Sequence, residues 1–287
     1  MYVSVRDCML PVMGIADPAK ALKKLGLSAA ELSVGKDTAV SSFMREDGKP
    51  FLLKDKGAAA ALAALLKKKG VSVCAFLMGN DFSSDDLEGE VAALIATSRA
   101  AVEMGVPAVR IDLIPHKQGM PENDFIARAA QVAKRTFAEC PKIKLAIENH
   151  GGTSNRPEFL EKVFDAAGDK RLGLTLDTGN FYWFGHPLDK IYQIMETYGS
   201  LVYHTHCKNI SYPVEMRNIQ REIGYKYGEY VAPIYAGDVD HAKAVAILKK
   251  AGYKGSMCVE DESLGKFSKE EQAEVLKKDV DFLKSLV

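Results

Sequence analysis

The chain has 287 residues, of which 47% are hydrophobic and 26% are charged. This balance is typical of a globular protein and excludes an intrinsically disordered chain. Lysine plus arginine and aspartate plus glutamate both number 38, so the formal net charge is zero. A protein that holds nucleic acid or an anionic membrane usually carries a basic excess, so we expect a small-molecule partner, with no nucleic acid and no membrane.

The sequence also indicates a cytoplasmic protein. Gly57–Leu66, the longest charge-free apolar stretch of note, is only half as long as a membrane span. Arg6 and Asp7 lie where a signal peptide needs its apolar core. The five cysteines are scattered without a CxxC pair, which fits reduced thiols better than a disulfide framework.

Strand-like and helix-like segments alternate along the chain. The expected strands are Tyr2–Cys8, Ala30–Val34, Val71–Met78, Ala108–Ile114, Lys144–Glu148, Leu172–Asp177, Leu201–Cys207 and Ser256–Glu260. The expected helices are Pro18–Leu25, Gly57–Lys69, Leu87–Met104, Asp124–Glu139, Pro157–Ala167, Pro187–Tyr198, His241–Ala251 and Ser268–Leu286. Ser268 and Glu271 have the spacing of a capping box for the last helix.

Eight strand–helix units of about 36 residues each predict an α/β protein with a parallel sheet. The sheet can be a closed (β/α)8 barrel or an open, doubly wound sheet. The number of units and the chain length favour the barrel, and no GxGxxG follows the first strand as dinucleotide-binding open sheets require. We therefore predict one TIM-barrel domain over residues 1–287.

Four polar residues occupy equivalent places on the last four expected strands: Glu148, Asp177, His206 and Glu260. Side chains alternate between the two faces of a strand, and the apolar neighbours of these residues take the opposite face. All four should therefore point inward at the carboxyl ends of their strands, where barrel active sites lie. Successive spacings of 29, 29 and 54 residues predict a long loop after the seventh strand.

Three carboxylates and an imidazole that converge in a barrel mouth would repel one another without a cation. A single acidic residue at a strand end is more often a helix cap or a solvated rim residue. Four such residues with matching parity instead predict a shared site for Mn²⁺, Mg²⁺ or Co²⁺, with Zn²⁺ also suitable. Open coordination positions on such an ion would polarise substrate oxygens.

Motifs at these positions resemble the sugar phosphate isomerase/epimerase group of the xylose-isomerase-like TIM barrel superfamily. The residues that carry the resemblance are IENHGG at 147–152, LDTGNF at 176–181, HTHCKN at 204–209 and CVED at 258–261. Three further stretches, at 22–34, 98–113 and 246–260, are similar to other parts of the family barrel. The resemblance is specific for the fold and the metal site, and weak for the substrate.

This resemblance implies that Glu148, Asp177, His206 and Glu260 hold a metal, and that Glu148 and Glu260 also act as acid and base. Of the ions that suit this ligand set, we expect Mn²⁺ first. His204 then lies either directly behind the metal ligands or in the packed core. Ketose 3-epimerases usually have a histidine where Asn180 stands and an arginine where Tyr212 stands. Both departures weigh against a free-ketose 3-epimerase.

Further candidates surround the four expected ligands. Strand parity and position make His150, Asn180, Lys208 and Arg217 candidates for substrate binding, the last from the long loop Ile210–Asp240. Arg110 and Asp112 share a face and suit an inward ion pair, and Glu31 also suits an inward position. The aromatic run at 181–184 can wall the pocket or simply pack, and the long loop can cover a substrate or contact a second subunit in a homo-oligomer.

The sequence leads us to expect a metal-dependent isomerase or epimerase of a sugar, sugar phosphate or cyclitol, acting by proton abstraction next to a carbonyl. The same ligands suit a dehydratase of the inosose or dehydroshikimate type, because ligands alone do not select among these outcomes. An apurinic endonuclease is a weaker alternative, since it needs a basic DNA-facing surface. A non-catalytic sugar-binding barrel is the remaining alternative.

Overall fold

The computed structural model describes residues 1–287 and contains one sheet of eight parallel strands. In chain order these are β1 (Tyr2–Arg6), β2 (Ala29–Val34), β5 (Ser72–Met78), β6 (Val109–Ile111), β7 (Leu145–Glu148), β8 (Leu172–Asp177), β9 (Val202–His206) and β12 (Ser256–Val259). Their order in the sheet is β12-β1-β2-β5-β6-β7-β8-β9, which follows the chain except that β12 lies beside β1. The eight expected strands are all present.

The sheet closes between its first and last strands in this order. The amide of Cys207 donates to the carbonyl of Cys258 at 2.7 Å, and the amide of Glu260 donates to the carbonyl of Cys207 at 3.0 Å. These bonds lie just beyond the end of β9 and link it to β12. The prediction of a closed barrel rather than an open sheet is confirmed.

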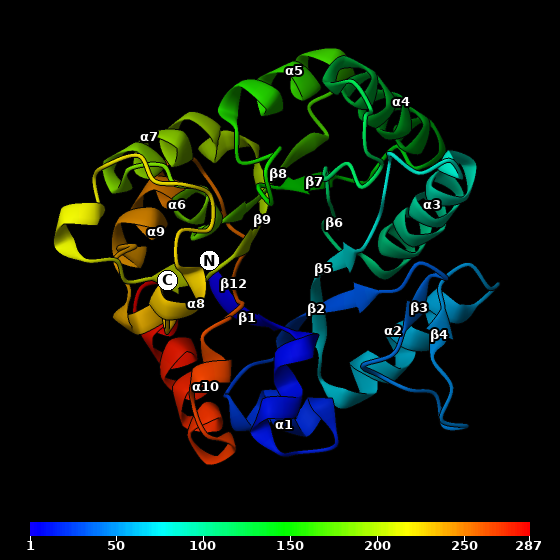
Figure 1. The fold of residues 1–287 in the computed structure, drawn as a ribbon. Coiled ribbons are helices and arrows are strands. Elements are labelled where there is room, and N and C mark those ends of the chain that lie inside the picture. The colour runs from blue at the N-terminus through cyan, green and yellow to red at the C-terminus, as the bar shows by residue number, and fades with distance from the viewer.

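Eight helices surround the strands, as Figure 1 shows. They are α1 (Pro18–Lys24), α2 (Ala58–Lys69), α3 (Leu87–Met104), α4 (Glu122–Glu139), α5 (Pro157–Ala167), α7 (Leu188–Tyr198), α9 (His241–Lys250) and α10 (Lys269–Lys284). Ser268 and Glu271 form the expected capping box at the start of α10, which satisfies two amides of its first turn. None of the helices combines the length and the apolar character that crossing a bilayer requires.

Short elements decorate the loops of the barrel. Two antiparallel hairpins pair β3 (Ala39–Val40) with β4 (Phe51–Leu52) and β10 (Asn209–Ile210) with β11 (Val231–Ala232). Two one-turn helices are α6 (Asn180–Trp183) and α8 (Tyr227–Tyr230). Turns of 3-10 helix cover Asp7–Met13, Gly199–Leu201, Val214–Met216, Ile234–Ala236 and Leu264–Lys266.

Two strands, β1 and β6, end more than one residue before the predicted end, and polar side chains explain both. The carboxylate of Asp7 accepts the amide and the hydroxyl of Ser33 at 2.8 and 2.7 Å, and the chain enters a 3-10 turn after Arg6 instead of continuing as a strand. The amide of Asp112 donates to the side chain of Asn80 at 2.9 Å, so β6 ends at Ile111. In both places a side-chain oxygen replaces a strand partner.

Alternation along the strands divides the barrel into an apolar shell and a polar interior. On β7, for example, Leu145 and Ile147 belong to the hydrophobic core of the molecule, whereas Glu148 meets polar side chains of other strands. Burial of the apolar face against the helices supplies the main driving force for the fold. The inward face is left to polar groups, which must find partners with one another.

Candidate metal centre

The structure brings the four expected ligands together at one end of the barrel. Glu148, Asp177 and His206 are the last residues of β7, β8 and β9, and Glu260 directly follows β12. All four are at least 96% buried. One ligand atom from each lies within 4.8 Å of the others, a separation that one ion can span with a small rotation of the side chains.

The carboxylate of Glu31 holds His206 in place. The sequence predicted only that Glu31 faces the interior of the barrel, not that it contacts His206. Nε2 of His206 lies 2.9 and 3.0 Å from the two carboxylate oxygens of Glu31 on β2. Glu31 also lies 3.0 Å from Nε2 of His204. A carboxylate in this place keeps the ring proton on Nε2, so that Nδ1 presents its lone pair on the opposite side, as in carboxylate–histidine–metal arrangements.

Three of the four candidate ligands present a buried atom without a hydrogen-bond partner. These atoms are Asp177 Oδ2, His206 Nδ1 and Glu260 Oε2. His206 Nδ1 lies 3.1 Å from Glu260 Oε2. The lone pair of a neutral Nδ1 would repel this carboxylate oxygen, and a cation between the two atoms would remove the repulsion. Buried polar atoms are rarely left unpaired, and a shared cation would satisfy all three at once. The residues present therefore fit a divalent metal.

The charge inside the mouth leads to the same conclusion. Six carboxylates, from Glu31, Asp112, Glu148, Asp177, Glu260 and Glu262, are joined by ion pairs to only three cations, from Arg6, Arg110 and Lys208. With the histidines neutral, this group carries an excess of three negative charges. Burying unbalanced charge is costly, and one divalent cation would offset most of it.

The same negative field shifts the pKa of the ligands. Burial acts to lower the pKa of His206, but the carboxylates of Glu31 and Glu148 outweigh burial and raise it to about 9. Burial acts to raise the pKa of Glu148, but Arg110 and His206 hold it well below its ordinary value. The pKa of Asp177 is raised, because its burial is only partly offset by Lys208. The carboxylates thus already attract a proton to His206, and a metal would replace that proton.

Glu260 and Glu148, the expected acid–base residues, each form an ion pair with an arginine. Arg6, from the end of β1, pairs with Oε1 of Glu260 and leaves Oε2 facing His206. Arg110 on β6 pairs with both Glu148 and Asp112, which confirms the expected inward ion pair. Sequence reasoning missed the role of Arg6, although its place on the inward face of β1 was a usable signal.

Three of the expected substrate-binding residues lie at this centre. The amide of Asn180 donates to Oε1 of Glu148 at 3.1 Å. The ammonium of Lys208 lies 3.3 Å from Oδ2 of Asp177 and 2.7 Å from Oε1 of Glu262. His150 is nearer the solvent, with 42% of its side chain exposed, and its Nδ1 lies 2.9 Å from Asp112.

Arg217, the fourth expected substrate-binding residue, has its side-chain partners in the long loop. Its guanidinium pairs with Asp238 at 3.0 Å and donates to the carbonyl of Tyr212 at 3.1 Å. Both partners belong to the long loop, so Arg217 joins two parts of this loop to each other. The structure therefore gives Arg217 a structural contact that sequence spacing could not anticipate.

The long loop is built around buried aromatic residues and a second arginine. Arg221 donates to the carbonyls of Tyr182 and His186 at 3.1 and 2.9 Å, and its guanidinium lies 4.4 Å from the ring centres of Tyr182 and Tyr212. Phe181 and Tyr182 are fully buried, which favours packing over a pocket wall for these two. Tyr227 from α8 bonds to Glu262, which in turn holds Lys208, so the loop reaches the edge of the candidate metal centre.

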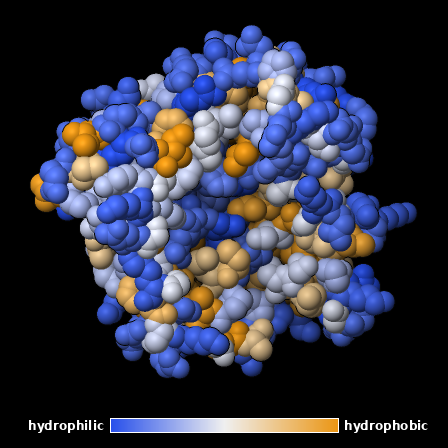
Figure 2. Space-filling view, in the orientation of Figure 1, coloured by the Kyte–Doolittle hydropathy of each residue, from blue (hydrophilic) through white to orange (hydrophobic).

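Figure 2 shows that the face seen in Figure 1 is hollowed at its centre, with hydrophilic residues on the floor of the hollow. The long loop and the loop after β7 lie on the same side as the four ligands. The arrangement can hold a cation, bind several hydroxyl or carbonyl oxygens beside it, and keep carboxylates next to the bound molecule.

Comparison with solved structures supports the same architecture. The IolI protein, solved with a bound zinc atom, superposes with a TM-score of 0.70 at 18% identity, over 100% of this chain and 99% of that one. The 3-keto-D-glucoside 4-epimerase YcjR from E. coli gives a TM-score of 0.69 at 13% identity, over 99% of both chains. The probable 3-DHS dehydratase AsbF from Bacillus anthracis gives 0.65 at 13% identity, over 99% and 98%.

At these identities the likeness establishes the fold alone. No curated protein matches the chain. The family model described as the xylose isomerase-like TIM barrel matches residues 19–286, which is nearly the whole chain. This chain belongs to the xylose isomerase-like TIM barrel family.

Proposed function

We propose that the protein is a divalent-metal-dependent isomerase or epimerase that moves a proton on the carbon next to a carbonyl of a sugar, sugar phosphate or cyclitol. The observation that carries the proposal is the set of three buried ligand atoms, on Asp177, His206 and Glu260, that have no hydrogen-bond partner. The functions named for the solved relatives, an epimerase and a dehydratase, act on small oxygen-rich molecules and support this substrate class.

Glu148, Asp177, His206 and Glu260 would hold the cation. When bound, the cation polarises the substrate carbonyl and a neighbouring hydroxyl. Mn²⁺ is our first choice for the ion, and Mg²⁺, Co²⁺ and Zn²⁺ also suit this ligand set.

Glu148 and Glu260 would carry the proton. They approach Nδ1 of His206 to 3.3 and 3.1 Å from two different strands, β7 and β12, which have β8 and β9 between them. A substrate bound over His206 therefore meets one glutamate on each side. One carboxylate can take the proton from the first face while the other, protonated, returns a proton to the second face.

Arg6, Arg110 and the side-chain amide of Asn180 set the charge and the orientation of these glutamates. Arg110 keeps Glu148 ionised and so able to accept a proton, and Asn180 fixes the direction of Oε1. Arg6 holds Oε1 of Glu260, which leaves Oε2 for the bound molecule. Lys208 lies between Asp177 and Glu262 and would bind a substrate oxygen with its ammonium group.

A dehydratase is the second candidate, and the pair of His150 and Asp112 favours it. The hydrogen bond to Asp112 raises the pKa of His150, so the imidazole is protonated over a wider pH range than usual. One ligand atom each from Asp112, Glu148 and His150 lies within 4.8 Å of the others. His150 could then protonate a departing β-hydroxyl while Glu148 takes the neighbouring proton.

Solvent deuterium exchange tests the proposal. The Mn²⁺-loaded protein is incubated in D₂O with a panel of ketoses, inososes and keto acids, and products are read by mass spectrometry and NMR. We expect deuterium at the carbon next to the carbonyl, with retention of the hydroxyls for an isomerase or epimerase and loss of water for a dehydratase. Absence of exchange and of turnover across the panel would contradict both candidates.

A further inference from the structure

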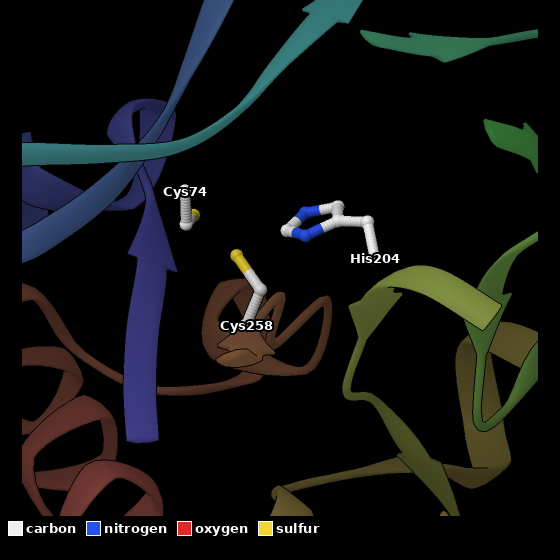
Figure 3. Close-up of side chains that lie close together, drawn as sticks. All are labelled: Cys74, His204 and Cys258. Carbon is white, nitrogen blue, oxygen red and sulfur yellow. The ribbon is translucent and has the colours of Figure 1, made fainter. Parts of the chain in front are cut away.

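A second group of metal-binding side chains lies inside the same barrel, one layer below the candidate metal centre. Cys74 on β5, His204 on β9 and Cys258 on β12 each offer one ligand atom, and these atoms lie within 4.8 Å of one another. All three residues are at least 97% buried. Figure 3 shows the sulfur of Cys258 pointing into the space between Cys74 and the imidazole of His204.

The strand positions explain this convergence. His204 and Cys258 lie two residues before His206 and Glu260, so they share the inward face with those ligands but lie nearer the amino ends of the strands. Such interior positions in barrels are usually filled by branched aliphatic side chains. Two thiols and an imidazole in their place form the ligand set that Zn²⁺ prefers.

Glu31 contacts both histidines, with hydrogen-bond geometry to His206 and a close approach to His204. Its carboxylate lies 3.0 Å from Nε2 of His204 and 2.9 Å from Nε2 of His206. With Nε2 facing the carboxylate, the remaining nitrogen of each ring is available to a metal. One carboxylate thus orients His206 toward the mouth and His204 toward the two cysteines.

A cavity leads to this cluster from the opposite end of the barrel. It has a volume of about 330 Å³ and is lined by residues that include Cys74, His204, Tyr2, Val202 and Ser256. The last three begin β1, β9 and β12, so the cavity opens at the amino ends of the strands. An ion can therefore reach Cys74 and His204 without passing through the candidate metal centre.

A disulfide does not suit the same two cysteines. β1 and β2 lie between β12 and β5 in the sheet, which separates the two backbones by three strand spacings of about 4.8 Å each along the curved sheet. A disulfide needs Cα atoms within about 7 Å of each other. A zinc ion instead bridges ligands at about 2.3 Å from sulfur and about 2.0 Å from nitrogen, so small side-chain rotations suffice.

We propose that Cys74, His204 and Cys258 form a second, thiolate-containing metal site for Zn²⁺, separate from the candidate metal centre and reached from the amino end of the barrel. Each bound thiol releases its proton to solvent as the sulfur–zinc bond forms. The hydroxyl of Ser4, which accepts a hydrogen bond from Cys74 Sγ at 3.2 Å, lies beside the site. Three protein ligands leave the fourth coordination position to a group from the cavity.

Cobalt absorption separates the two sites, because only the lower one contains sulfur. Metal-free, reduced, full-length protein is titrated with Co²⁺, and we expect a sulfur-to-cobalt charge-transfer band that Zn²⁺ then abolishes. Asp177→Asn, which removes a ligand of the upper centre, should keep the band. Lack of a band in the parent, or its loss in Asp177→Asn, would overturn the assignment, whatever the outcome of the deuterium exchange.

Variants of the cysteines identify the ligands. Cys74→Ser combined with Cys258→Ser should abolish the band and weaken zinc binding at this site by more than about 100-fold, since even the loss of an outer partner of a metal site costs 10- to 100-fold. Cys140→Ser is the matched control, because Cys140 is also buried but lies outside the cluster. A band that persists in the double variant would overturn the proposal.

A crystallographic measurement needs no substitution. Crystals of the parent protein grown with Zn²⁺ are measured on both sides of the zinc absorption edge. We expect an anomalous peak between the two sulfurs and His204. A map with a peak at the upper centre and none at the cysteines would overturn the proposal, even if the double variant failed to fold.

Discussion

The two ends of the barrel interior use the same strands but hold different chemistry. At the carboxyl ends, six carboxylates and three cations surround the candidate metal centre, so negative charge is in excess. At the amino ends the cluster consists of two thiols and an imidazole beside a serine hydroxyl. The upper end suits hard cations and substrate oxygens, whereas the lower end suits a soft or borderline metal.

The comparison teaches that parity along a strand places functional groups in layers, while the kind of group decides what each layer binds. His204 and His206 differ by one step along β9, and both face Glu31. An imidazole therefore belongs to both layers: His206 to an oxygen-rich site, and His204 to a sulfur-rich site in the next layer. Four predictions test this division, beginning with the largest expected effect.

Substitution of Glu148 by glutamine should lower kcat by about 10² to 10⁴, with a much smaller change in KM at saturating Mn²⁺. Glutamine keeps the size of the side chain and one oxygen but cannot accept a proton at neutral pH. The same change at Glu260 should act similarly. Steady-state kinetics on whichever substrate exchanges deuterium provides the measurement.

Glu139→Gln is the control for these variants, because Glu139 is exposed and pairs with Arg99 on the outside of the barrel. Its turnover should equal that of the parent. If both Glu148→Gln and Glu260→Gln turned over within a few-fold of the parent, another group would have to move the proton, with Lys208 and His150 the first to examine.

Glu31→Gln should weaken metal binding in both layers, by roughly 10- to 100-fold at each. The amide keeps the size of the side chain but lacks the negative charge that faces both imidazoles. Calorimetric titration with Mn²⁺ reports on the upper layer, and the cobalt band reports on the lower one. Glu88→Gln, at an exposed glutamate paired with Arg135, is the control.

An effect of Glu31→Gln on one metal only would show that one histidine is oriented by other groups. An unchanged affinity for both would contradict the role of Glu31 altogether. Because Glu31 touches neither proposed ion in our assignment, it is a positioning residue, and the affinity measurements distinguish that role from a general loss of stability.

A pair of buried carboxyl groups behind β12 offers a contrast to the mouth, because no ion pair reaches them. Asp261 follows β12, and Asp279 lies in α10. Burial and the neighbouring Asp261 raise the pKa of Asp279 to about 9. One carboxyl group of the pair therefore keeps its proton at neutral pH, whereas the mouth balances its charge with arginine, lysine and, as we propose, a cation.

Asp279→Asn should therefore flatten the pH dependence of stability. In the parent, the native state binds a proton that the unfolded chain has released above a pKa of 3.8, so the free energy of unfolding falls as pH rises from about 4 to about 9. Urea denaturation across this range measures the slope. Asp281→Asn, on the exposed side of the same helix, should keep the slope of the parent, and an equal slope in Asp279→Asn would contradict the assignment.

The smallest effect is expected from Cys74→Ser. With zinc excluded and Mn²⁺ saturating, kcat should stay within about two-fold of the parent, because the thiol lies in the lower layer and touches none of the four upper ligands. Parallel kinetics of Cys140→Ser corrects for the general effect of replacing a buried thiol. A loss of turnover comparable to that of Glu148→Gln would show that the two layers act as one site.

Several features of this protein were determined by local sequence. The alternation of strands and helices predicts the barrel, because hydrophobic periodicity is set by neighbouring residues. Strand parity and the polar residues at strand ends place Glu148, Asp177, His206 and Glu260 in one mouth, because parallel strands in a closed barrel must all end on the same side. The inward pair of Arg110 and Asp112 follows from the same two-residue period.

The tertiary structure alone decided which charged groups meet. Arg6 pairs with Glu260 across 254 positions, and Glu31 faces His206 across 175 positions. Cys74, His204 and Cys258 converge from three separate strands, and Arg217 turns to Asp238 rather than to the centre. No local pattern encodes such contacts, because strand order and stagger around the barrel decide which inward side chains become neighbours.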